Sequence, residues 1–260
     1  LDNIGRAEKL IVLKSRQEIE KIRKSCQIVA ETLKEVRDAV RPGVTTKKLD
    51  EIAERGLTKR GAVPAFKGYR GFPNSLCTSV NESVVHGVPS TLRLKEGDGI
   101  SFDLGSLYDG YFGDAAITVG IGQISEEAAR LLKNTEKALY TAIEKGKAGN
   151  HLYDISGSIQ AFAEDKGYSV VRDFVGHGIG SNLHEEPQIP NFVPENDSRG
   201  PLLKEGMVLA LEPMMNIGTH EVKILNDQWT VITADRKLSA HFEHTIAITN
   251  KEADILSKFH

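Results

Sequence analysis

The chain has 260 residues, 40% of them hydrophobic and 27% charged, and its 33 Lys and Arg against 36 Asp and Glu give a net charge of −3. This composition is ordinary for a soluble globular protein and excludes collagens, coiled-coil rods, disordered tails and strongly basic nucleic-acid-binding proteins. Two cysteines cannot build a disulfide framework, the apolar stretch at residues 10–13 is too short for a signal peptide, and no apolar run approaches a membrane span. A cytoplasmic protein without a membrane segment is therefore expected.

Two helices open the chain. Ser15 followed by Glu18 forms a capping-box pattern, and an apolar stripe with steps of three and four continues until Pro42 and Gly43 end the helix. Cys26 falls within this stripe and is interpreted as a core residue. A second helix is predicted over about 46–59, followed by strands over 75–80, 100–104 and 111–119.

The same order of elements then repeats. Helices are predicted from Ser125 to about Gly146 and over roughly 154–166, followed by strands over 168–171, 207–212, 229–233 and 242–249. The sequence Leu-Lys-Glu-Gly occurs at 94–97 and at 203–206, and in both places an acid, Asp103 or Glu212, follows six residues after the glycine. These features predict a segment 1–14 and one α+β domain over 15–260, with similar halves at about 15–120 and 125–250 around one sheet.

Asp103 and Asp114 lie in two strand-like segments that flank a turn. A hairpin centred on Tyr108 and Asp109 would place the two carboxylates directly opposite each other on one face. Two adjacent carboxylates repel each other unless a cation or a shared proton neutralises them. A metal-binding pair is therefore one interpretation, and two solvated acids near a turn are the alternative.

Two further acids and a histidine follow. Glu212 ends a predicted strand, Glu243 precedes an apolar run, and His177 lies between two glycines that allow close approach of backbone or ligand. Each alone is as readily a strand-end acid or a loop histidine. Taken together, a carboxylate-rich set with one imidazole suits Mn, Fe, Co or Zn, and carboxylates can bridge two ions.

Four segments around these residues resemble the motifs of type I methionine aminopeptidases, which are dinuclear metalloaminopeptidases. The segments are Asn81–Pro89 (NESVVHGVP), 175–187 (VGHGIGSNLHEEP), Leu211–Asn216 (LEPMMN) and 239–249 (SAHFEHTIAIT), and the similarity extends over about residues 15–250. The resemblance implies the pita-bread (creatinase/aminopeptidase) fold, in which two pseudo-symmetric halves place helices outside a central antiparallel sheet. The 35 residues from His177 to Glu212 leave no room for the helical insertion of type II enzymes.

The resemblance also implies roles for individual residues. Asp103 would chelate one divalent metal ion, Asp114 and Glu243 would bridge two, and His177 and Glu212 would complete the set of ligands around the other ion. Glu212 would in addition carry a proton from water to the leaving amine. His184 would stabilise the tetrahedral intermediate and His86 would bind near the scissile amide; a surface histidine and a turn histidine are the alternatives.

A methionine pocket and a further cation site are implied as well. The pocket would be formed, together with His86, by Phe66, Tyr69, Phe72, Cys77 and Trp229, for which ordinary core packing is the alternative. A monovalent cation would bind backbone carbonyls of Asn81, Ser83 and Ser239.

The implied activity is removal of the initiator methionine from nascent polypeptides whose second residue is small. The expected partners are N-terminal methionyl peptides, with the ribosome as a further candidate, and the expected assembly is a monomer that binds neither membranes nor specific nucleic acids. Two alternatives remain. One is a prolidase or aminopeptidase P, which shares the ligand set and usually carries an additional N-terminal domain, and the other is a non-catalytic pita-bread protein that only binds peptides.

Overall fold

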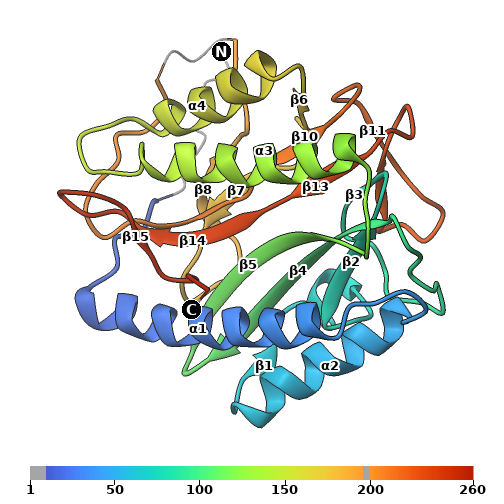
Figure 1. Ribbon diagram of the computed structural model, residues 1–260. Helices are drawn as coiled ribbons and strands as arrows, with labels where there is room; N and C mark the ends of the chain where they lie inside the picture. Colours follow the sequence, from blue (N-terminus) through green and yellow to red (C-terminus); the bar gives the residue numbers. More distant parts are fainter. Residues whose placement is uncertain (1–9, 196–198, 260) are drawn as a thin grey trace, which may run out of the picture.

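The computed structural model describes residues 10–195 and 199–259, so residues 1–9 of the expected N-terminal segment lie outside it. The described part contains four α-helices, α1 (Arg16–Asp38), α2 (Thr46–Lys59), α3 (Glu126–Ile143) and α4 (Leu152–Asp165). Figure 1 shows α1 and α2 below the strands and α3 and α4 above them. The predicted α+β class, with helices outside a central layer of strands, is confirmed. Among the described residues, none of the helices combines the length and the hydrophobicity of a membrane span.

The start of α1 shows how local sequence sets an element. The Ser15 hydroxyl accepts a hydrogen bond from the Glu18 backbone N–H at 3.3 Å, and the Glu18 carboxylate accepts one from the Ser15 N–H at 2.8 Å. The helix α1 contacts strands β4 (Gly99–Tyr108) and β5 (Tyr111–Gly120), and its Cys26 is fully buried, which confirms the core interpretation. Burial raises the pKa of the Cys26 thiol to about 12, so the group stays protonated and unreactive.

The main sheet is antiparallel throughout its described pairs. Its strands, in spatial order, are β1 (Val63–Pro64), β4 (Gly99–Tyr108), β5 (Tyr111–Gly120), β14 (Glu243–Ala247), β9 (Val208–Leu211), β7 (Gly176–Gly178) and β8 (Glu185–Ile189). In addition, β2 (Leu76–Val80) pairs with β4, and β15 (Asp254–Ile255) pairs with β14. The pairing of β5 with β14 joins strands from the two parts of the chain, with Ala115 opposite His244 and Ala116 opposite Glu243.

Two smaller three-stranded sheets complete the layer. One contains β13 (Ser239–His241), β10 (Met214–Asn216) and β6 (Ser169–Val170), and the other contains β11 (Val222–Ile224), β12 (Val231–Thr233) and β3 (Ser83–Val85). The short 3-10 helix η1 (Tyr69–Gly71) lies between β1 and β2. The exact division of the chain into two similar halves stays a prediction.

The predicted register of the β4–β5 hairpin is wrong. Tyr108 pairs with Tyr111, so the turn is the two-residue loop Asp109-Gly110, and both of its residues have positive φ, 49° and 80°. Asp-Gly favours this kind of tight turn, whose twist matches that of the flanking strands. Consequently Asp103 lies opposite Ala116 rather than opposite Asp114. The two carboxylates still share a face of the sheet, but as diagonal neighbours.

Two predicted strands also have different limits. The segment 242–249 is not one strand, because β13 ends at His241 in a small sheet and β14 begins at Glu243 in the main sheet. Trp229 precedes β12 instead of beginning it, since its N–H and that of Thr230 donate to the Asp227 carboxylate at 2.9 and 2.8 Å. Trp229 and Glu243, which lie next to these breaks, line the cavity described next.

Candidate metal centre

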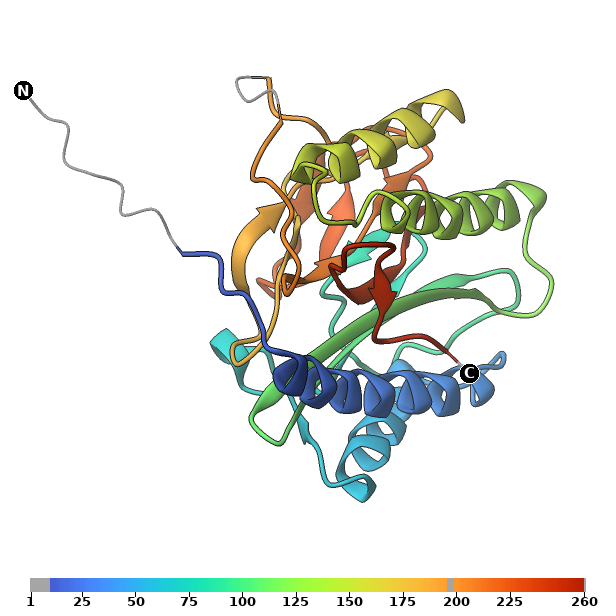
Figure 2. The same cartoon turned by 90° about the vertical axis from the view of Figure 1, so that its left-hand side faces the viewer.

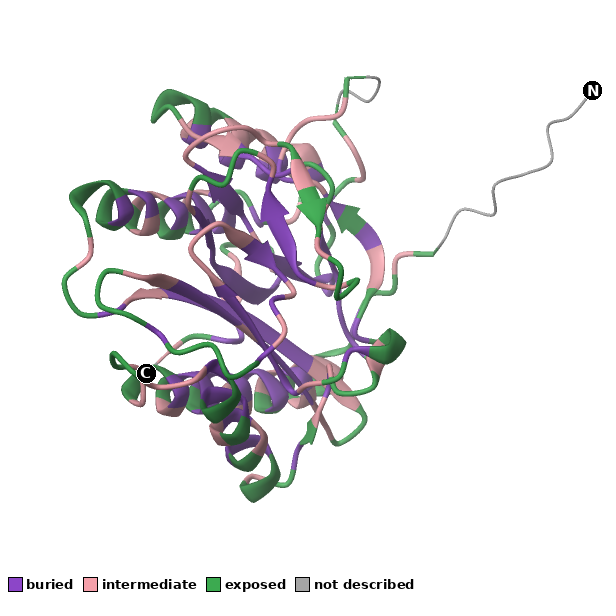
Figure 3. Cartoon of the chain, turned by 90° about the vertical axis from the view of Figure 1, so that its right-hand side faces the viewer, coloured by how far each residue is buried: buried purple, intermediate pink, exposed green. Residues whose placement is uncertain are grey.

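One cavity of about 150 Å³ brings together every side chain proposed from the sequence for metal binding, catalysis and substrate recognition. In Figure 3 the central strands of the main sheet are coloured mostly as buried. Its walls are formed by Phe66, Tyr69, Arg70, Phe72, Cys77, His86, Asp103, Asp114, His177, Leu183, His184, Glu212, Trp229 and Glu243. The set contains acids and histidines together with aromatic side chains and a thiol.

Strand register explains why the acids converge. Ala116 of β5 lies opposite Asp103 on one side and opposite Glu243 on the other, so these two residues share a face with Asp114, which lies two positions from Ala116. His177 lies opposite Ala210 of β9, two residues before Glu212. The alternative that Asp103 and Asp114 are solvated turn acids is thereby removed, because both line the cavity.

His177 lies in strand β7 rather than in a loop. Its Nδ1 is 2.9 Å from the Gly178 carbonyl oxygen, which makes Nδ1 the protonated donor and leaves Nε2 with a free lone pair. This Nε2 lies 3.7 Å from the Glu212 carboxylate. The flanking glycines are required by backbone packing, since a Cβ on Gly176 would overlap the Ala210 carbonyl.

Ligand atoms of Asp114, His177 and Glu243 lie within 4.8 Å of one another. Within the described residues, one carboxylate oxygen each of Asp103, Asp114 and Glu243 is fully buried and has no hydrogen-bond partner. Leaving charged oxygens buried and unpaired is costly unless a metal ion compensates for the lost water. The donor set of carboxylates and one imidazole therefore fits divalent metal ions.

Burial raises the pKa of all four acids. It raises that of Asp103 to about 7, and those of Asp114, Glu212 and Glu243 well above their usual values, where the neighbouring carboxylate charges add to the effect. Burial has the opposite effect on His177, whose pKa falls to about 3. At neutral pH the imidazole is thus neutral and free to ligate, whereas the metal-free acids retain protons.

We expect metal binding to release protons and to change the pH dependence of stability. Above pH ~4, where unfolded carboxyls ionise, the folded metal-free protein holds more protons than the unfolded chain, so these acids lower the free energy of unfolding as pH rises. The buried histidines act in the opposite direction, but only below pH ~6.5. The free energy of unfolding of the metal-free protein should therefore fall between pH 6.5 and 8, by up to ~1.4 kcal/mol per pH unit for each retained proton.

Denaturant unfolding across this pH range measures the fall, and calorimetry of Mn²⁺ binding in two buffers of different ionisation enthalpy counts the released protons. A metal-free protein that becomes more stable from pH 6.5 to 8, or that binds metal without releasing protons, would contradict this account.

His184 is an exposed residue at the rim of the cavity and is held by Tyr69. The Tyr69 hydroxyl lies 2.9 Å from His184 Nδ1, the two rings stack at 5.3 Å, and the His184 ring centroid is 4.3 Å from that of His177. Partial loss of solvent, followed by the positive charge of Arg70, lowers the pKa of His184 to about 4. If Tyr69 donates to Nδ1, the neutral ring carries its proton on Nε2.

His86 combines a turn conformation with a place in the cavity wall. Its φ of 57° is in the left-handed region, which is uncommon for a residue with a Cβ, and Gly87 follows because a Cβ there would overlap the Thr78 carbonyl. The His86 ring packs edge-on against Phe174 at 5.3 Å, and burial lowers its pKa to about 4. Such strained residues cluster at functional sites.

The predicted methionine pocket is brought together by the fold. Phe72 and Trp229 pack edge to face at 5.3 Å, Cys77 lies opposite Asp103 in the strand register, and Phe66 lies directly over Gly105. All five predicted pocket residues line the same cavity as the acids. The proposed carbonyl site for a monovalent cation stays a prediction. The N–H of Ser239 donates to the Asn81 carbonyl at 3.0 Å, whereas Ser83 lies in β3 opposite Ile232.

Sequence reasoning missed three residues of the site: Arg70, Leu183 and His241. Arg70 and Leu183 line the cavity, and Arg70 has a left-handed φ of 49°. His241 is 1% exposed, and its Nε2 lies 3.9 Å from the Glu212 carboxylate, while neither ring nitrogen has a hydrogen-bond partner among the described residues. Its position two residues before Glu243 would indicate a shared face only within one continuous strand, whereas β13 ends at His241 and β14 begins at Glu243.

Comparison with known proteins identifies close relatives. The model of metallopeptidase family M24 matches residues 20–250. Methionine aminopeptidase from Clostridium perfringens is 52% identical over 248 residues, covering 95% of this chain and 99% of that protein. The crystal structure of methionine aminopeptidase from Thermotoga maritima superposes with a TM-score of 0.93 at 44% identity, over 96% of this chain and all of that one. Prolidase from Pyrococcus furiosus gives a TM-score of 0.77 at 25% identity, and the match covers 96% of this chain but 66% of the prolidase.

Proposed function

The chain belongs to metallopeptidase family M24, and we propose that it works as a methionine aminopeptidase whose cavity combines a metal centre with a pocket for the N-terminal methionine side chain. The pita-bread fold and the hydrolase activity follow from relatives that match nearly the whole chain. The observation that carries the assignment of the site is that one cavity is lined both by all the predicted metal ligands and by the predicted pocket residues.

Hydrolysis of Met-Ala-Ser compared with an Xaa-Pro peptide tests this function. A methionine aminopeptidase cleaves the first peptide, a prolidase or aminopeptidase P cleaves the second, and a non-catalytic binding protein cleaves neither. The prolidase alternative is the weaker one, because the match to the Pyrococcus prolidase has lower identity and covers about two thirds of that chain.

The proposed ligands for two divalent ions are Asp103, Asp114, His177, Glu212 and Glu243, with Asp114 and Glu243 shared between the ions. The unpaired buried oxygens of Asp103, Asp114 and Glu243 and the free Nε2 of His177 support this assignment. When bound at such a site, divalent metal ions supply Lewis-acid chemistry and lower the pKa of a water molecule toward neutrality. The choice among Co, Mn, Fe and Zn stays open, because this donor set accepts each of them.

Glu212 is proposed as the group that accepts a proton from the attacking water and passes it to the leaving amine. It follows the end of β9, so its carboxylate projects into the cavity between His177 and His241, at 3.7 and 3.9 Å from their Nε2 atoms. Burial, followed by the charges of Asp103 and Asp114, raises the pKa of Glu212 in the metal-free protein.

His184 and His86 are proposed to donate hydrogen bonds to the substrate. With Tyr69 donating to its Nδ1, His184 presents Nε2–H to the oxygen that becomes negatively charged as the tetrahedral intermediate forms. His86 is fixed by its backbone and by Phe174, which places a neutral imidazole in the same cavity, next to the position proposed for the scissile amide.

We expect a strong preference for Met and norleucine over Ala, Val or Phe at the first substrate position. An apolar pocket of aromatic rings and one thiol suits an unbranched thioether, and one methylene more or less changes kcat/KM by ~10–200-fold. Phe66→Ala should relax this preference without changing metal content, as measured on otherwise identical tripeptides. Phe162→Ala, on α4 and outside the cavity, is the control. Equal kcat/KM for Met-Ala-Ser and Ala-Ala-Ser would overturn the pocket assignment.

Further properties are proposals that rest on the same assignment. The enzyme would act as a cytoplasmic monomer on nascent chains with a small second residue, in contact with the ribosome. A monovalent cation would bind carbonyls of Asn81, Ser83 and Ser239. Co-sedimentation with ribosomes, sedimentation velocity and activity in K⁺ compared with a bulky organic cation test these properties separately.

A further inference from the structure

The residues before α1 contact the second part of the chain close to the cavity. The Lys14 N–H donates to the Gly206 carbonyl at 2.7 Å, and a Cβ on Gly206 would press against the Lys14 backbone. Figure 2 shows this dark-blue segment running down beside the second part of the chain before it enters α1. The backbone of Lys14 is therefore held in place independently of the contacts that its side chain makes.

The Lys14 side chain forms a buried ion pair with Glu185. Its Nζ lies 2.5 Å from Glu185 Oε2, and the two side chains are 4% and 9% exposed. Nζ also donates to the Val12 carbonyl at 3.1 Å. Because burying two charges costs about as much free energy as their attraction returns, such a pair is weak evidence for added stability. A role in fixing one conformation is the better explanation.

Glu185 is the first residue of β8 and directly follows the loop that carries His184. Its Oε1 accepts a hydrogen bond from the Asn182 N–H at 3.0 Å, which closes the loop, and a Cβ on Gly180 would overlap the Lys14 side chain. The Gly180 carbonyl in turn accepts from the Phe112 N–H at 2.8 Å, two residues before Asp114. On the cavity side, Tyr69 holds His184. The loop is thus held from outside by Lys14 and from inside by Tyr69.

We propose that Lys14 is a positioning residue: through Glu185 it fixes the 180–185 loop so that His184 points at the reacting carbonyl. The proposal rests on the proposed role of His184. A buried pair spanning 171 residues of sequence, next to that histidine, supports it. Displacing a catalytic group by about 1 Å can cost up to ~10²-fold in rate.

Lys14→Met keeps the length and apolar character of the side chain but removes its charge. We expect kcat on Met-Ala-Ser to fall at least tenfold, with KM and metal content changed less than twofold. Lys14→Met with Glu185→Gln removes both buried charges and keeps an acceptor for the Asn182 N–H. This double variant should regain thermal stability while kcat stays low. Recovery of kcat together with stability would show a purely structural pair and overturn the proposal.

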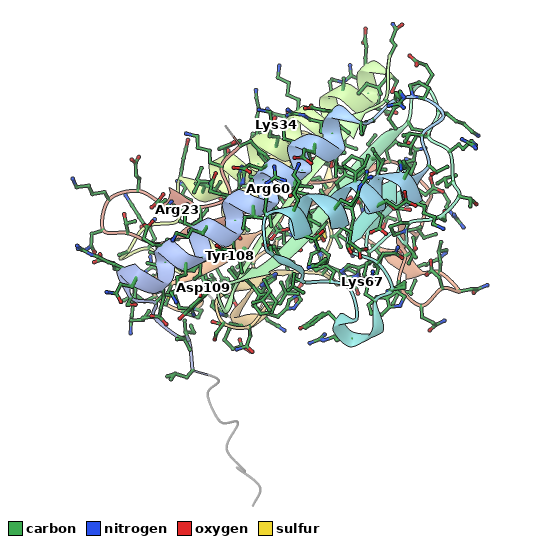
Figure 4. All side chains as sticks on the ribbon, turned by 90° about the horizontal axis from the view of Figure 1, so that it is seen from below. Arg23, Lys34, Arg60, Lys67, Tyr108 and Asp109 are labelled. Atoms are coloured by element: carbon green, nitrogen blue, oxygen red, sulfur yellow. The ribbon has the colours of Figure 1, made fainter. Side chains whose placement is uncertain are left out.

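Arg23→Met is the matched control. Arg23 on the outer face of α1 also pairs with a distant residue, Asp254, at 2.6 Å, but both side chains are more exposed (Figure 4). This variant should keep wild-type kcat.

A double-mutant cycle that combines Lys14→Met with His184→Ala tests this proposal separately from the proposed function of the enzyme. If Lys14 acts through His184, Lys14→Met has little further effect on kcat in the His184→Ala background. An equal fold-loss in both backgrounds would overturn the positioning role and leave the proposed function intact. Wild-type kcat in His184→Ala alone would instead refute the proposed role of His184.

Discussion

Exhaustive removal of divalent metal ions is expected to abolish peptide hydrolysis, and Mn²⁺, Co²⁺ or Fe²⁺ should restore it. The physical reason is the cluster of four buried acids, three of which have an oxygen without any partner in the described ranges, beside a neutral His177. Without a metal ion to activate a water molecule, these acids and His177 provide no nucleophile that attacks an amide bond. Peptide hydrolysis before and after chelation, with metal content measured by elemental analysis, tests the expectation. Full activity in a sample shown to be metal-free would contradict it.

Glu212→Gln should lower kcat by at least ~10²–10⁴-fold, the usual contribution of general acid–base catalysis. The amide is nearly isosteric and still offers an oxygen to a metal ion, but it cannot accept a proton from water. We expect the fold to persist, since the side chain lies at the end of β9 and not within the apolar core. Circular dichroism and elemental analysis check fold and metal content alongside the kinetics.

Glu221→Gln, which changes an exposed acid outside the cavity, is the control for this experiment and should leave kcat unchanged. A Glu212→Gln variant with full metal occupancy and near-normal kcat would refute the proton-transfer role. A variant that loses activity only in proportion to lost metal would assign Glu212 to metal binding alone.

Helices and their starting points could be predicted from the sequence because their signals are local. Ser15 with Glu18, and the apolar steps that follow, are sufficient to define α1, whose cap and buried stripe are confirmed. The β4–β5 register was missed because the Asp109-Gly110 turn competes with a hairpin centred one residue earlier. A one-residue choice of turn shifts the partner of every residue in the hairpin.

In the site, too, the residues within local motifs could be predicted, whereas the residues that depend on contacts with distant parts of the chain could not. The spacing of acids and histidines within family-like motifs predicted which side chains meet, and the cavity contains them all. His241 could not be predicted because the chain breaks between β13 and β14, and this break depends on the pairing of the two strands with different sheets. The His241 Nε2 lies 3.9 Å from the Glu212 carboxylate as a result. The Lys14–Glu185 ion pair could not be predicted because nothing in the sequence around either residue indicates a partner 171 residues away.

The antiparallel contact between β5 and β14 has a consequence for how the protein is made. A ribosome that has delivered the first 120 residues has released β4 and β5, but the strand that covers the free edge of β5 begins only at residue 243. Until then the edge of β5 at Ala115 and Ala116 lacks its strand partner, and an unpaired strand edge is a template for pairing with other chains. Synthesis of this protein therefore passes through an aggregation-prone stage that ends when almost the whole chain has emerged.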